Sequence, residues 1–386
     1  MNARVAVVRC SSYEKPRLRD AIGRSLELIG GLGAIIGTGS KVFVKINHLS
    51  PGSPPERAIV THPLFTRQVL EFLKDLGANI TVGDDIQSGS VDGFEVSGYG
   101  AMCREMGVRL INLKSAGFRE VPCAGGEALK SVHVSSVVLE ADSIVDLPKL
   151  KTHSFTAFTG AVKNMFGVIP YGSRLELHSR FPGSDAFGRM LVDIFACVPP
   201  RLTLMDGIVA MEGPGPAGGS ARPVGLVLAG RDAVAVDAIA QDLVGFGPDD
   251  VETTASAARR GLGTADPGAI EIAGEPLADV RVKRFRKASL PVGLLKRKLP
   301  AFLYAYVSGE LVLSPEVVPA ACTGCGECFN VCPRRAVVME GGRARIHKEP
   351  CIGCLCCHEV CRADAIRLRQ RPVGRAARVL ASLFRL

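Results

Sequence analysis

Nine of the thirteen cysteines of this chain lie between residues 322 and 361. Eight of these form two runs with the same spacing, C-x2-C-x2-C-x3-C. The runs are Cys322, Cys325, Cys328 and Cys332, then Cys351, Cys354, Cys357 and Cys361. In this spacing three thiolates hold one cubane iron–sulfur cluster while the fourth binds the neighbouring cluster. The sequence therefore predicts two 4Fe-4S clusters.

Because the fourth cysteine crosses over, each predicted cluster takes ligands from both runs. The first cluster set is Cys322, Cys325, Cys328 and Cys361. The second cluster set is Cys351, Cys354, Cys357 and Cys332. Zinc is the alternative, but structural zinc sites usually pair two C-x2-C clips across a longer loop. Cys356 is an extra thiol beside the second run, and a spare buried cysteine explains it better than an exchange of ligands.

The two runs belong to an internal repeat with a constant offset of 29 positions, as 351 minus 322 shows. The match continues beyond the cysteines, since Val317 aligns with Ile346 and Val337 aligns with Ile366. One departure is Arg362, which stands where the first run has Pro333. Residues 315–370 closely resemble bacterial two-cluster ferredoxins, and this resemblance implies a small α+β domain with pseudo-twofold symmetry.

Composition sets the frame for the rest of the chain. With 386 residues and 47% hydrophobic content, the chain can bury one large core besides the small cluster domain. The other cysteines suggest no disulfide framework, and cluster ligands must be free thiolates, so we expect a cytoplasmic protein. The apolar run Val5–Val8 is too short for a signal peptide, and no stretch approaches the ~20 apolar residues of a membrane span.

The basic charge is concentrated at the C-terminal end. Residues 281–386 carry 20 Lys or Arg against 7 Asp or Glu, a difference of +13, whereas the whole chain carries +9. We interpret residues 281–314 as a basic linker and 371–386 as a basic amphipathic tail. Such segments bind an anionic membrane surface or an acidic redox partner, unless they pack on their own protein. Nucleic acid is not expected, because neither segment belongs to a recognisable binding module.

Residues 1–280 alternate short apolar runs with helical patterns. The runs are rich in Val and Ile, and they read VAVVR, KVFVKI, NITVGDD, SIVDLPK, LTLMDG and VGLVLAG. Pro63 and Gly77 mark the start and the end of one helical pattern. This order predicts an α/β domain with a mostly parallel sheet and helices on both faces.

Polar side chains follow four of these predicted strands. They are Lys45, Asn47 and His48; Asp84 and Asp85; Asp146, Lys149, Lys151 and His153; and Asp206 and Glu212. Solvated loops would explain any one of them. Because parallel strands bind ligands at their carboxyl ends, the coincidence at four ends predicts a site on that edge.

The segment 147–170, LPKLKTHSFTAFTGAVKNMFGVIP, is the most informative part of this edge. Lysines among apolar residues and a short helix opening at Gly160 suit an anionic substrate, although a surface lysine cluster is the alternative. The expected substrate-binding residues are Lys45, Asn47, Lys149, Lys151, Lys163 and Asn164. His153 and Asp84 are the expected proton-transfer residues. The glycine-rich stretches lack nucleotide-binding spacing, so neither a nucleoside triphosphate nor NAD is expected.

Several motifs resemble the family called domain of unknown function 362 (DUF362). They are VKINH (44–48), THP (61–63), GDD (83–85), LPKLKTH, TGAVKNMFG and LMDGIVAMEGPGP (204–216). The resemblance spans nearly all of residues 4–275, and a C-terminal two-cluster ferredoxin is a common companion in this family. The acidic loop departs from the family's more frequent Gly-Asp-Ser, since Asp85 follows Asp84. The resemblance implies an architecture and leaves the reaction open.

Three functions fit these features. In the first, an oxidoreductase passes electrons from two clusters to an anionic organic substrate in the α/β domain, and the tethered ferredoxin favours it. In the second, a non-catalytic electron carrier or assembly adaptor docks a partner enzyme. In the third, a redox-neutral proton-transfer enzyme uses its clusters only as structural staples, as its resemblance in layout to lactate-racemase-like domains suggests. A flavin is not indicated by the sequence and stays open as an additional cofactor.

Overall fold

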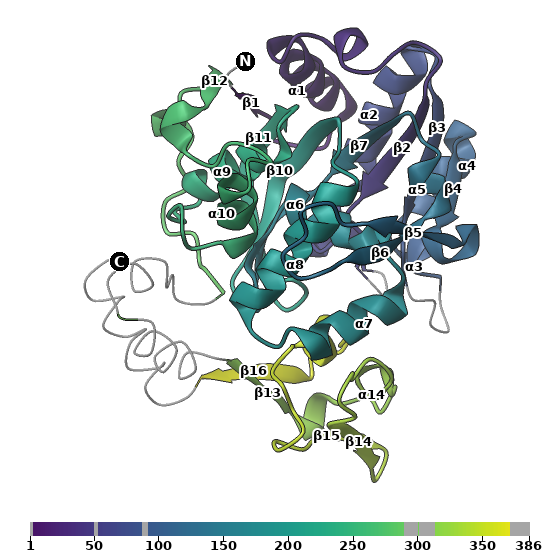
Figure 1. Ribbon diagram of the computed structural model, residues 1–386, viewed down its shortest axis with the longest axis vertical. Coiled ribbons are helices and arrows are strands. Elements are labelled where there is room, and N and C mark those ends of the chain that lie inside the picture. The colour runs from purple at the N-terminus through teal and green to yellow at the C-terminus, as the bar shows by residue number, and fades with distance from the viewer. Residues whose placement is uncertain (1–2, 50–52, 87–91, 289–299, 301–312, 371–386) are drawn as a thin grey trace.

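The computed structural model describes residues 3–49, 53–86, 92–288, 300 and 313–370. The chain forms a large α/β part and a small C-terminal part that lies against it, coloured yellow-green in Figure 1. The predicted tail 371–386 and most of the predicted linker 281–314 lie outside the described residues. Within the described ranges, no helix combines the length and the apolar character that crossing a membrane requires.

A ten-stranded sheet forms the centre of the large part, with its main strands in the order β12-β1-β11-β10-β7-β2-β3-β4. Its strands are β1 (Arg4–Arg9), β2 (Lys41–Ile46), β3 (Asn79–Asp84), β4 (Arg109–Asn112), β7 (Ser143–Leu147), β8 (Lys149–His153), β9 (Ala157–Thr159), β10 (Leu202–Glu212), β11 (Ser220–Gly230) and β12 (Glu271–Gly274). Neighbours from β7 to β4 run parallel, as do β10 with β7 and with β8. Antiparallel pairing occurs where β11 joins β1 and β10, and between β8 and β9. The predicted mostly parallel sheet is confirmed.

Helices cover both faces of this sheet. The long helices on one face are α1 (Lys15–Leu28), α2 (Pro63–Asp75) and α4 (Tyr99–Met106), and those on the other are α8 (Ser184–Cys197), α9 (Ala233–Leu243) and α10 (Glu252–Arg259). Alternation along β2 sends Val42 and Val44 into one core and Phe43 into the other. Helix α2 begins at the predicted Pro63, and Gly77 follows its end with a φ of 75°.

Shorter elements surround these layers. They are α3 (Gly93–Val96), β5 (Phe118–Pro122), β6 (Ser131–Ser135), α5 (Ser136–Leu139), α6 (Ala161–Asn164), α7 (Tyr171–Arg180) and α11 (Leu277–Val280). Residues 281–288, at the start of the predicted linker, pack on the large part. Phe285 is buried in its core, and Arg286 forms an ion pair with Glu212.

The small part is built from two related halves. Its elements are β13 (Leu313–Val317), α14 (Glu327–Asn330), β14 (Val337–Glu340), β15 (Arg343–Ile346), α15 (Cys356–Glu359) and β16 (Ile366–Gln370). Val317 pairs with Ile366 in β16, and Val337 pairs with Ile346 in β15, so each ladder joins one strand from each repeat. The backbone repeats as well, because Gly326 and Leu355 precede α14 and α15 with positive φ values of 77° and 64°. The predicted small α+β domain is confirmed.

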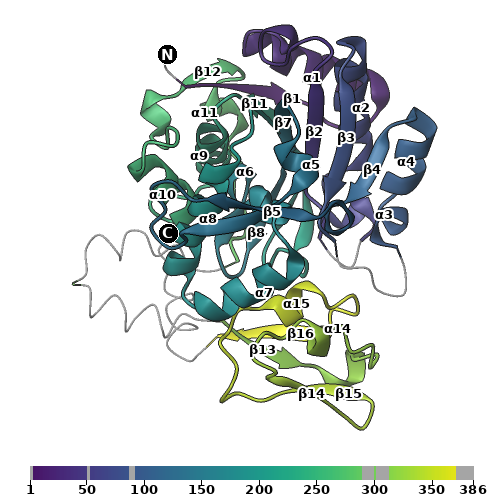
Figure 2. The same cartoon turned by 45° about the vertical axis from the view of Figure 1, so that its right-hand side comes forward.

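The small part packs against helix α7, and both views show the two side by side (Figures 1 and 2). Tyr171 and Leu175 of α7 contact its core. Polar contacts also cross between the parts: Arg57 forms an ion pair with Asp364 at 2.9 Å.

Candidate functional site

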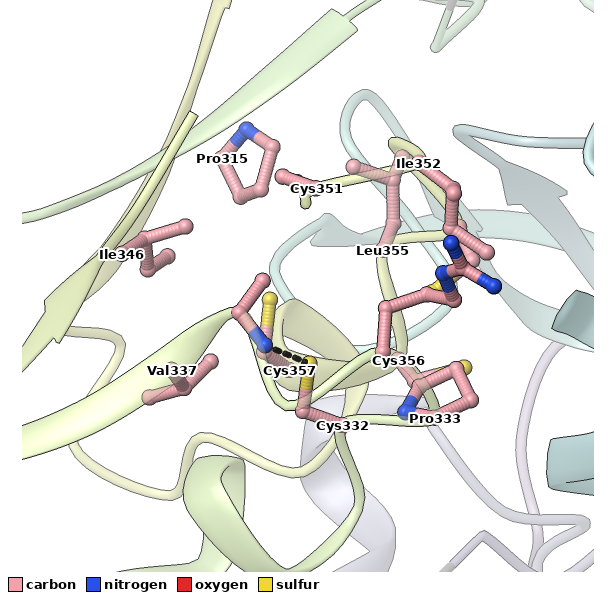
Figure 3. A pocket seen from close by; sticks show the side chains of 13 residues that line it. Pro315, Cys332, Pro333, Val337, Ile346, Cys351, Ile352, Leu355, Cys356 and Cys357 are labelled. Atoms are coloured by element: carbon pink, nitrogen blue, oxygen red, sulfur yellow. Dashed lines mark hydrogen bonds between the residues drawn. The ribbon is translucent and has the colours of Figure 1, made fainter. Parts of the chain in front are cut away.

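Two hollows in the small part each gather four of the predicted cluster ligands. One hollow is lined by the second cluster set, and Figure 3 shows Cys332, Cys351 and Cys357 among its side chains. The other hollow is lined by the first cluster set. The structure therefore brings together the crossed sets rather than the four cysteines of each run.

The chemistry of these thiols fits iron–sulfur clusters. Burial, together with the nearby thiols of its own set, raises the pKa of Cys328 to about 11. Four thiolates in an apolar hollow repel one another, and an iron–sulfur core would offset that repulsion. Backbone N–H groups also donate to the sulfurs at equivalent places of the repeat, from Ala336 to Cys332 at 3.1 Å and from Ala365 to Cys361 at 3.2 Å. Hydrogen bonds of this kind help to set the reduction potential of a cluster.

The extra thiol of Cys356 lines the same hollow as the second cluster set. Its hydrogen bond with Cys354 and its burial raise the pKa of Cys356 well above the usual value, while the same bond lowers the pKa of Cys354. Cys356 is thus the protonated donor of the pair, which suits a neighbour of the ligands.

At the strand ends, Lys45 and Asp84 form a buried ion pair. Nζ of Lys45 lies 2.8 Å from Oδ2 of Asp84, and it also donates to Oδ1 of Asn164 at 3.3 Å. Asn164 in turn donates to Asp146 at 2.6 Å. Burial raises the pKa of Asp84, and the charge of Lys45 opposes this shift. These predicted site residues are therefore partners of one another.

Lys149 is likewise neutralised inside the chain. Its Nζ lies 2.7 Å from Oδ2 of Asp206, and both side chains are fully buried. The hydroxyl of Tyr13 accepts from Lys149 at 2.9 Å and donates to Asp206 at 2.9 Å. Asn47 is also engaged, because its Nδ2 donates to the carbonyl of Ile59 at 2.9 Å.

The helix start at Gly160 has an internal anion too. The backbone N–H groups of Ala161 and Val162 donate to the carboxylate of Asp237, at 2.6 and 3.0 Å. Burial raises the pKa of Asp237 to about 7, and these two hydrogen bonds limit the rise. The anion that the sequence predicts for this helix start is thus supplied by the chain itself.

Two of the predicted lysines differ from the others. Among the described residues, no carboxylate lies within 4.0 Å of the amino group of Lys151 or Lys163. Lys151 donates to the carbonyl of Ile59 at 2.7 Å, and burial, with the charge of Lys163, lowers its pKa to about 7. The ammonium of Lys163 lies 5.8 Å from the ring centre of Phe166, and burial lowers its pKa. Neither lysine is therefore neutralised by a carboxylate of the described residues.

His153 lies next to them with its tautomer set by the backbone. Its Nδ1 accepts from the N–H groups of Phe155 and Thr156, at 3.0 and 3.3 Å. The proton of the neutral ring is therefore on Nε2. Burial, with the charge of Lys163, lowers the pKa of His153 to about 4. At neutral pH the ring is an uncharged donor.

The partner of His153 comes from the small part. Oε1 of Glu359, in α15, lies 3.3 Å from Nε2 of His153. Burial raises the pKa of Glu359, but the larger combined effect of His153 and Lys163 lowers this pKa to about 2. His178 is buried nearby, stacked on Phe187 with ring centres 4.3 Å apart. We call Lys151, His153, Lys163, His178 and Glu359 the strand-end site.

Sequence reasoning missed Glu359, because it belongs to the other part of the chain. The repeat itself contained one sign of this residue. Glu359 aligns with Asn330, so the second repeat has an ionisable side chain where the first has an amide. His178 packs among the rings of Phe155, Phe166 and Phe187, the surroundings of a structural histidine.

The fold and the cysteine sets define an iron–sulfur protein in which a ferredoxin-like part lies on an α/β part. Residues 314–362 match the family model described as 4Fe-4S dicluster domain. Residues 42–242 match the model described as domain of unknown function (DUF362). The chain belongs to the DUF362 family.

Two relatives match different parts of the chain. Thylakoid-associated protein sll1697 of Synechocystis sp. is 31% identical over 271 residues, which cover 69% of this chain and 82% of that protein. A ferredoxin of Methanothermococcus thermolithotrophicus is 36% identical over 47 residues, which cover 12% of this chain and 78% of the ferredoxin.

Solved structures resemble the large part only distantly. The lactate racemase apoprotein of Thermoanaerobacterium thermosaccharolyticum aligns with a TM-score of 0.38 and 16% identity, over 54% of this chain and 51% of that one. A protein of Thermotoga maritima aligns with a TM-score of 0.37 and 16% identity, over 56% and 55% of the chains. The chain thus spans about half the length of each.

Proposed function

We propose that this protein is an oxidoreductase that passes electrons from two 4Fe-4S clusters to an anionic organic substrate at the strand-end site. One observation carries the proposal: the carboxylate of Glu359 lies 3.3 Å from His153. Glu359 stands midway between Cys357 and Cys361, which are predicted ligands of the second and the first cluster. The clusters would therefore lie close to the side chains that bind and protonate a substrate.

The charges of the site favour an anion. Lys151 and Lys163 carry no carboxylate partner among the described residues, and an opposite charge in such a buried place interacts strongly. Among the charges of the described residues, the carboxylate of Glu359 does most to raise the pKa of both lysines. A substrate carboxylate or phosphate would replace or extend this interaction.

Each bound cluster supplies one electron at a time. A two-electron reduction therefore takes two transfers and two protons, with the electrons coming from an external one-electron donor protein. Lys151 can donate one proton near neutral pH, because burial lowers its pKa to about 7, and water would return a proton to it before the second transfer. His153 can orient the substrate through its Nε2–H. Asp84 is held by Lys45 and by the N–H of His48, so its role here is positioning.

The test uses the holoprotein under anaerobic conditions. Its clusters are reduced with dithionite, excess reductant is removed, and a panel of organic carboxylates and phosphates is screened for reoxidation of the visible absorbance. Lys151→Met and Lys163→Met should weaken binding while cluster absorbance persists, and His153→Gln should lower turnover more than binding. The exposed Lys130→Met is the control. Wild-type behaviour of all three site variants would exclude this site.

A second candidate is a non-catalytic electron carrier or assembly adaptor. It is favoured by the internal neutralisation of Lys45, Lys149 and the helix start at Gly160, and by the small part that covers His153. This candidate predicts that no small anion reoxidises the clusters and that a protein acceptor does.

We also propose a cytoplasmic protein with peripheral membrane contact through residues 371–386. Their basic, apolar composition supports this contact, as does the relative whose name describes it as thylakoid-associated.

A further inference from the structure

The two short helices of the small part are equivalent in the repeat but have different surroundings. Helix α15 faces the large part: Nε2 of His358 lies 3.1 Å from the carbonyl of Pro214, and Glu359 reaches His153. In α14 the equivalent positions are Phe329 and Asn330, and both are exposed.

The same contrast holds just after each helix. Asp364 forms the ion pair with Arg57 of the large part. Its counterpart in the first repeat is Arg335, which is exposed and has no ion pair among the described residues. Both residues have positive φ values, 48° and 51°, so the backbone presents them in the same way. We call Phe329, Asn330 and Arg335 the outer helix face.

The outer helix face is apolar and basic. Phe329 is 48% exposed, and only Leu64 is comparable among large apolar side chains of the described residues. Arg334 is exposed beside Arg335, and both follow the run that ends at Cys332. Exposed aromatic and arginine side chains are enriched in protein interfaces, and complementary charge speeds encounter.

The α14 end of this face adjoins the first cluster set, whereas Arg334, beside Arg335, lines the hollow of the second cluster set. Cys328 lies within α14, and Cys325, two residues before the helix, is exposed. A protein bound here would stand next to a cluster without access to the strand-end site, which α15 covers from the other repeat.

We propose that the outer helix face is the docking surface for an acidic one-electron donor protein. The proposal rests on the proposed function only in that the clusters carry electrons. In each encounter the donor loses one electron and the adjacent cluster gains it, and no bond or proton changes place. Electrons would enter through the outer helix face and leave at the strand-end site.

The test uses the full-length holoprotein and a small acidic [2Fe-2S] ferredoxin as the donor. Stopped-flow absorbance gives the rate of cluster reduction, and titration calorimetry with the oxidised ferredoxin gives Kd. Phe329→Ala and Arg335→Glu should each lower the second-order rate constant and weaken binding by about tenfold. The effect of Arg335→Glu should shrink as salt is added, because its charge is exposed.

Matched controls lie on the large part. Leu64→Ala removes a comparably exposed apolar side chain, and Arg24→Glu reverses an exposed charge on α1. Both should leave the rate and Kd unchanged. Reduction of Phe329→Ala by dithionite should match the wild type, since this small reductant needs no docking surface.

Three results would overturn the proposal: unchanged rate and Kd in both variants, equal losses in the controls, or slowed reduction by dithionite. A loss of donor binding on deletion of residues 373–386, with the outer-face variants unaffected, would move docking to the basic tail. Substrate-dependent reoxidation is measured separately, so a failure of docking is distinguishable from a failure of the proposed function.

Discussion

Glu359 and His153 meet at 3.3 Å, between Oε1 of the carboxylate and Nε2 of the ring. The ring is neutral with its proton on Nε2, because two backbone N–H groups donate to Nδ1. The carboxylate is ionised, with a pKa of about 2. A cysteine-rich motif and the strand ends of the sheet therefore share one buried contact, in which neither Nε2 of His153 nor Oε1 of Glu359 completes a hydrogen bond within the described residues.

Removing the charge of Glu359 should strengthen the binding of anions. In Glu359→Gln the lysines of the strand-end site lose their internal counter-charge, so a carboxylate or phosphate no longer competes with it. We expect Kd for such ligands to fall roughly fivefold, about 1 kcal/mol. Titration calorimetry measures this, and Glu349→Gln, an exposed change in the same part, is the control. Weaker binding in Glu359→Gln would contradict the model.

Cluster content should follow the crossed sets. Anaerobically purified protein should contain about eight irons and eight acid-labile sulfides. Cys361→Ser should perturb the cluster of Cys322, Cys325 and Cys328, which electron paramagnetic resonance of the reduced protein resolves. Cys356→Ser should leave both signals in place.

An altered second cluster in Cys361→Ser, with the first intact, would show that each run binds its own cluster. Zinc in place of iron, or about four irons, would contradict the two-cluster prediction.

Lys151 should make anion binding depend on pH near neutrality. Its pKa is lowered to about 7 by burial, so the amino group is charged below pH 7 and neutral above it. Affinity for an anion should therefore fall as pH rises through 7, and Lys151→Met should remove this dependence. Calorimetry between pH 6 and pH 9, from about one unit below to about two units above the shifted pKa, checks it.

The same shift has a consequence for stability. Between pH 7 and the ordinary value of 10.5, the unfolded chain binds more protons at Lys151 than the folded one. This lysine therefore destabilises the fold most below pH 7, and the penalty declines as pH rises to 10.5. Lys151→Met should raise the melting temperature more at pH 6 than at pH 10. An equal change at both pH values would contradict the shift.

Gly167 should tolerate no side chain. A Cβ there would stand 2.8 Å from Nζ of Lys45 and would also collide with Asp84. We expect Gly167→Ala to cost about 1–3 kcal/mol of unfolding free energy through this overpacking. Gly172→Ala, in helix α7, meets no atom within 4 Å and should stabilise the protein by about 0.5–1 kcal/mol. Chemical denaturation measures the free energy of unfolding of both variants. Equal values for Gly167→Ala and Gly172→Ala would contradict the close packing at Gly167.

The basic tail should affect association and leave chemistry unchanged. Deleting residues 373–386 should keep cluster content constant and weaken salt-sensitive binding to anionic vesicles. Vesicle sedimentation at two salt concentrations measures the loss. Loss of clusters in the truncated chain would instead indicate that the tail packs on its own protein.

Local spacing made the cluster part predictable from the sequence. The repeat is determined by the eight cysteines and by two pairs of matching apolar residues. These pairs are Val317 with Ile346 and Val337 with Ile366, and all four residues lie in strands. The strand ends were also readable, because apolar runs end in polar residues at Lys45, Asp84 and Lys149. These signals depend on neighbours in the sequence.

Contacts between residues that are far apart in the sequence could not be predicted in this way. A sequence shows that Lys45 and Lys149 are cations, but only the fold shows that Asp84 and Asp206 neutralise them, while Lys151 has no carboxylate partner in the part of the chain that the structure describes. The contact of Glu359 with His153 depends on how two parts dock, which no periodicity encodes. For the same reason the antiparallel insertion of β11 between β1 and β10 was not anticipated.

Helix α15 has four residues, too few to be stable alone, since even the first helical turn is costly to form. Its shape must come from what surrounds it, and Cys357 and Cys361 flank the residue that it delivers to His153. Metal insertion during biogenesis would then also complete the strand-end site, because iron-free chains would lack the scaffold that holds Glu359 beside His153. Assembly of the clusters and positioning of Glu359 beside His153 would then occur in the same step of maturation.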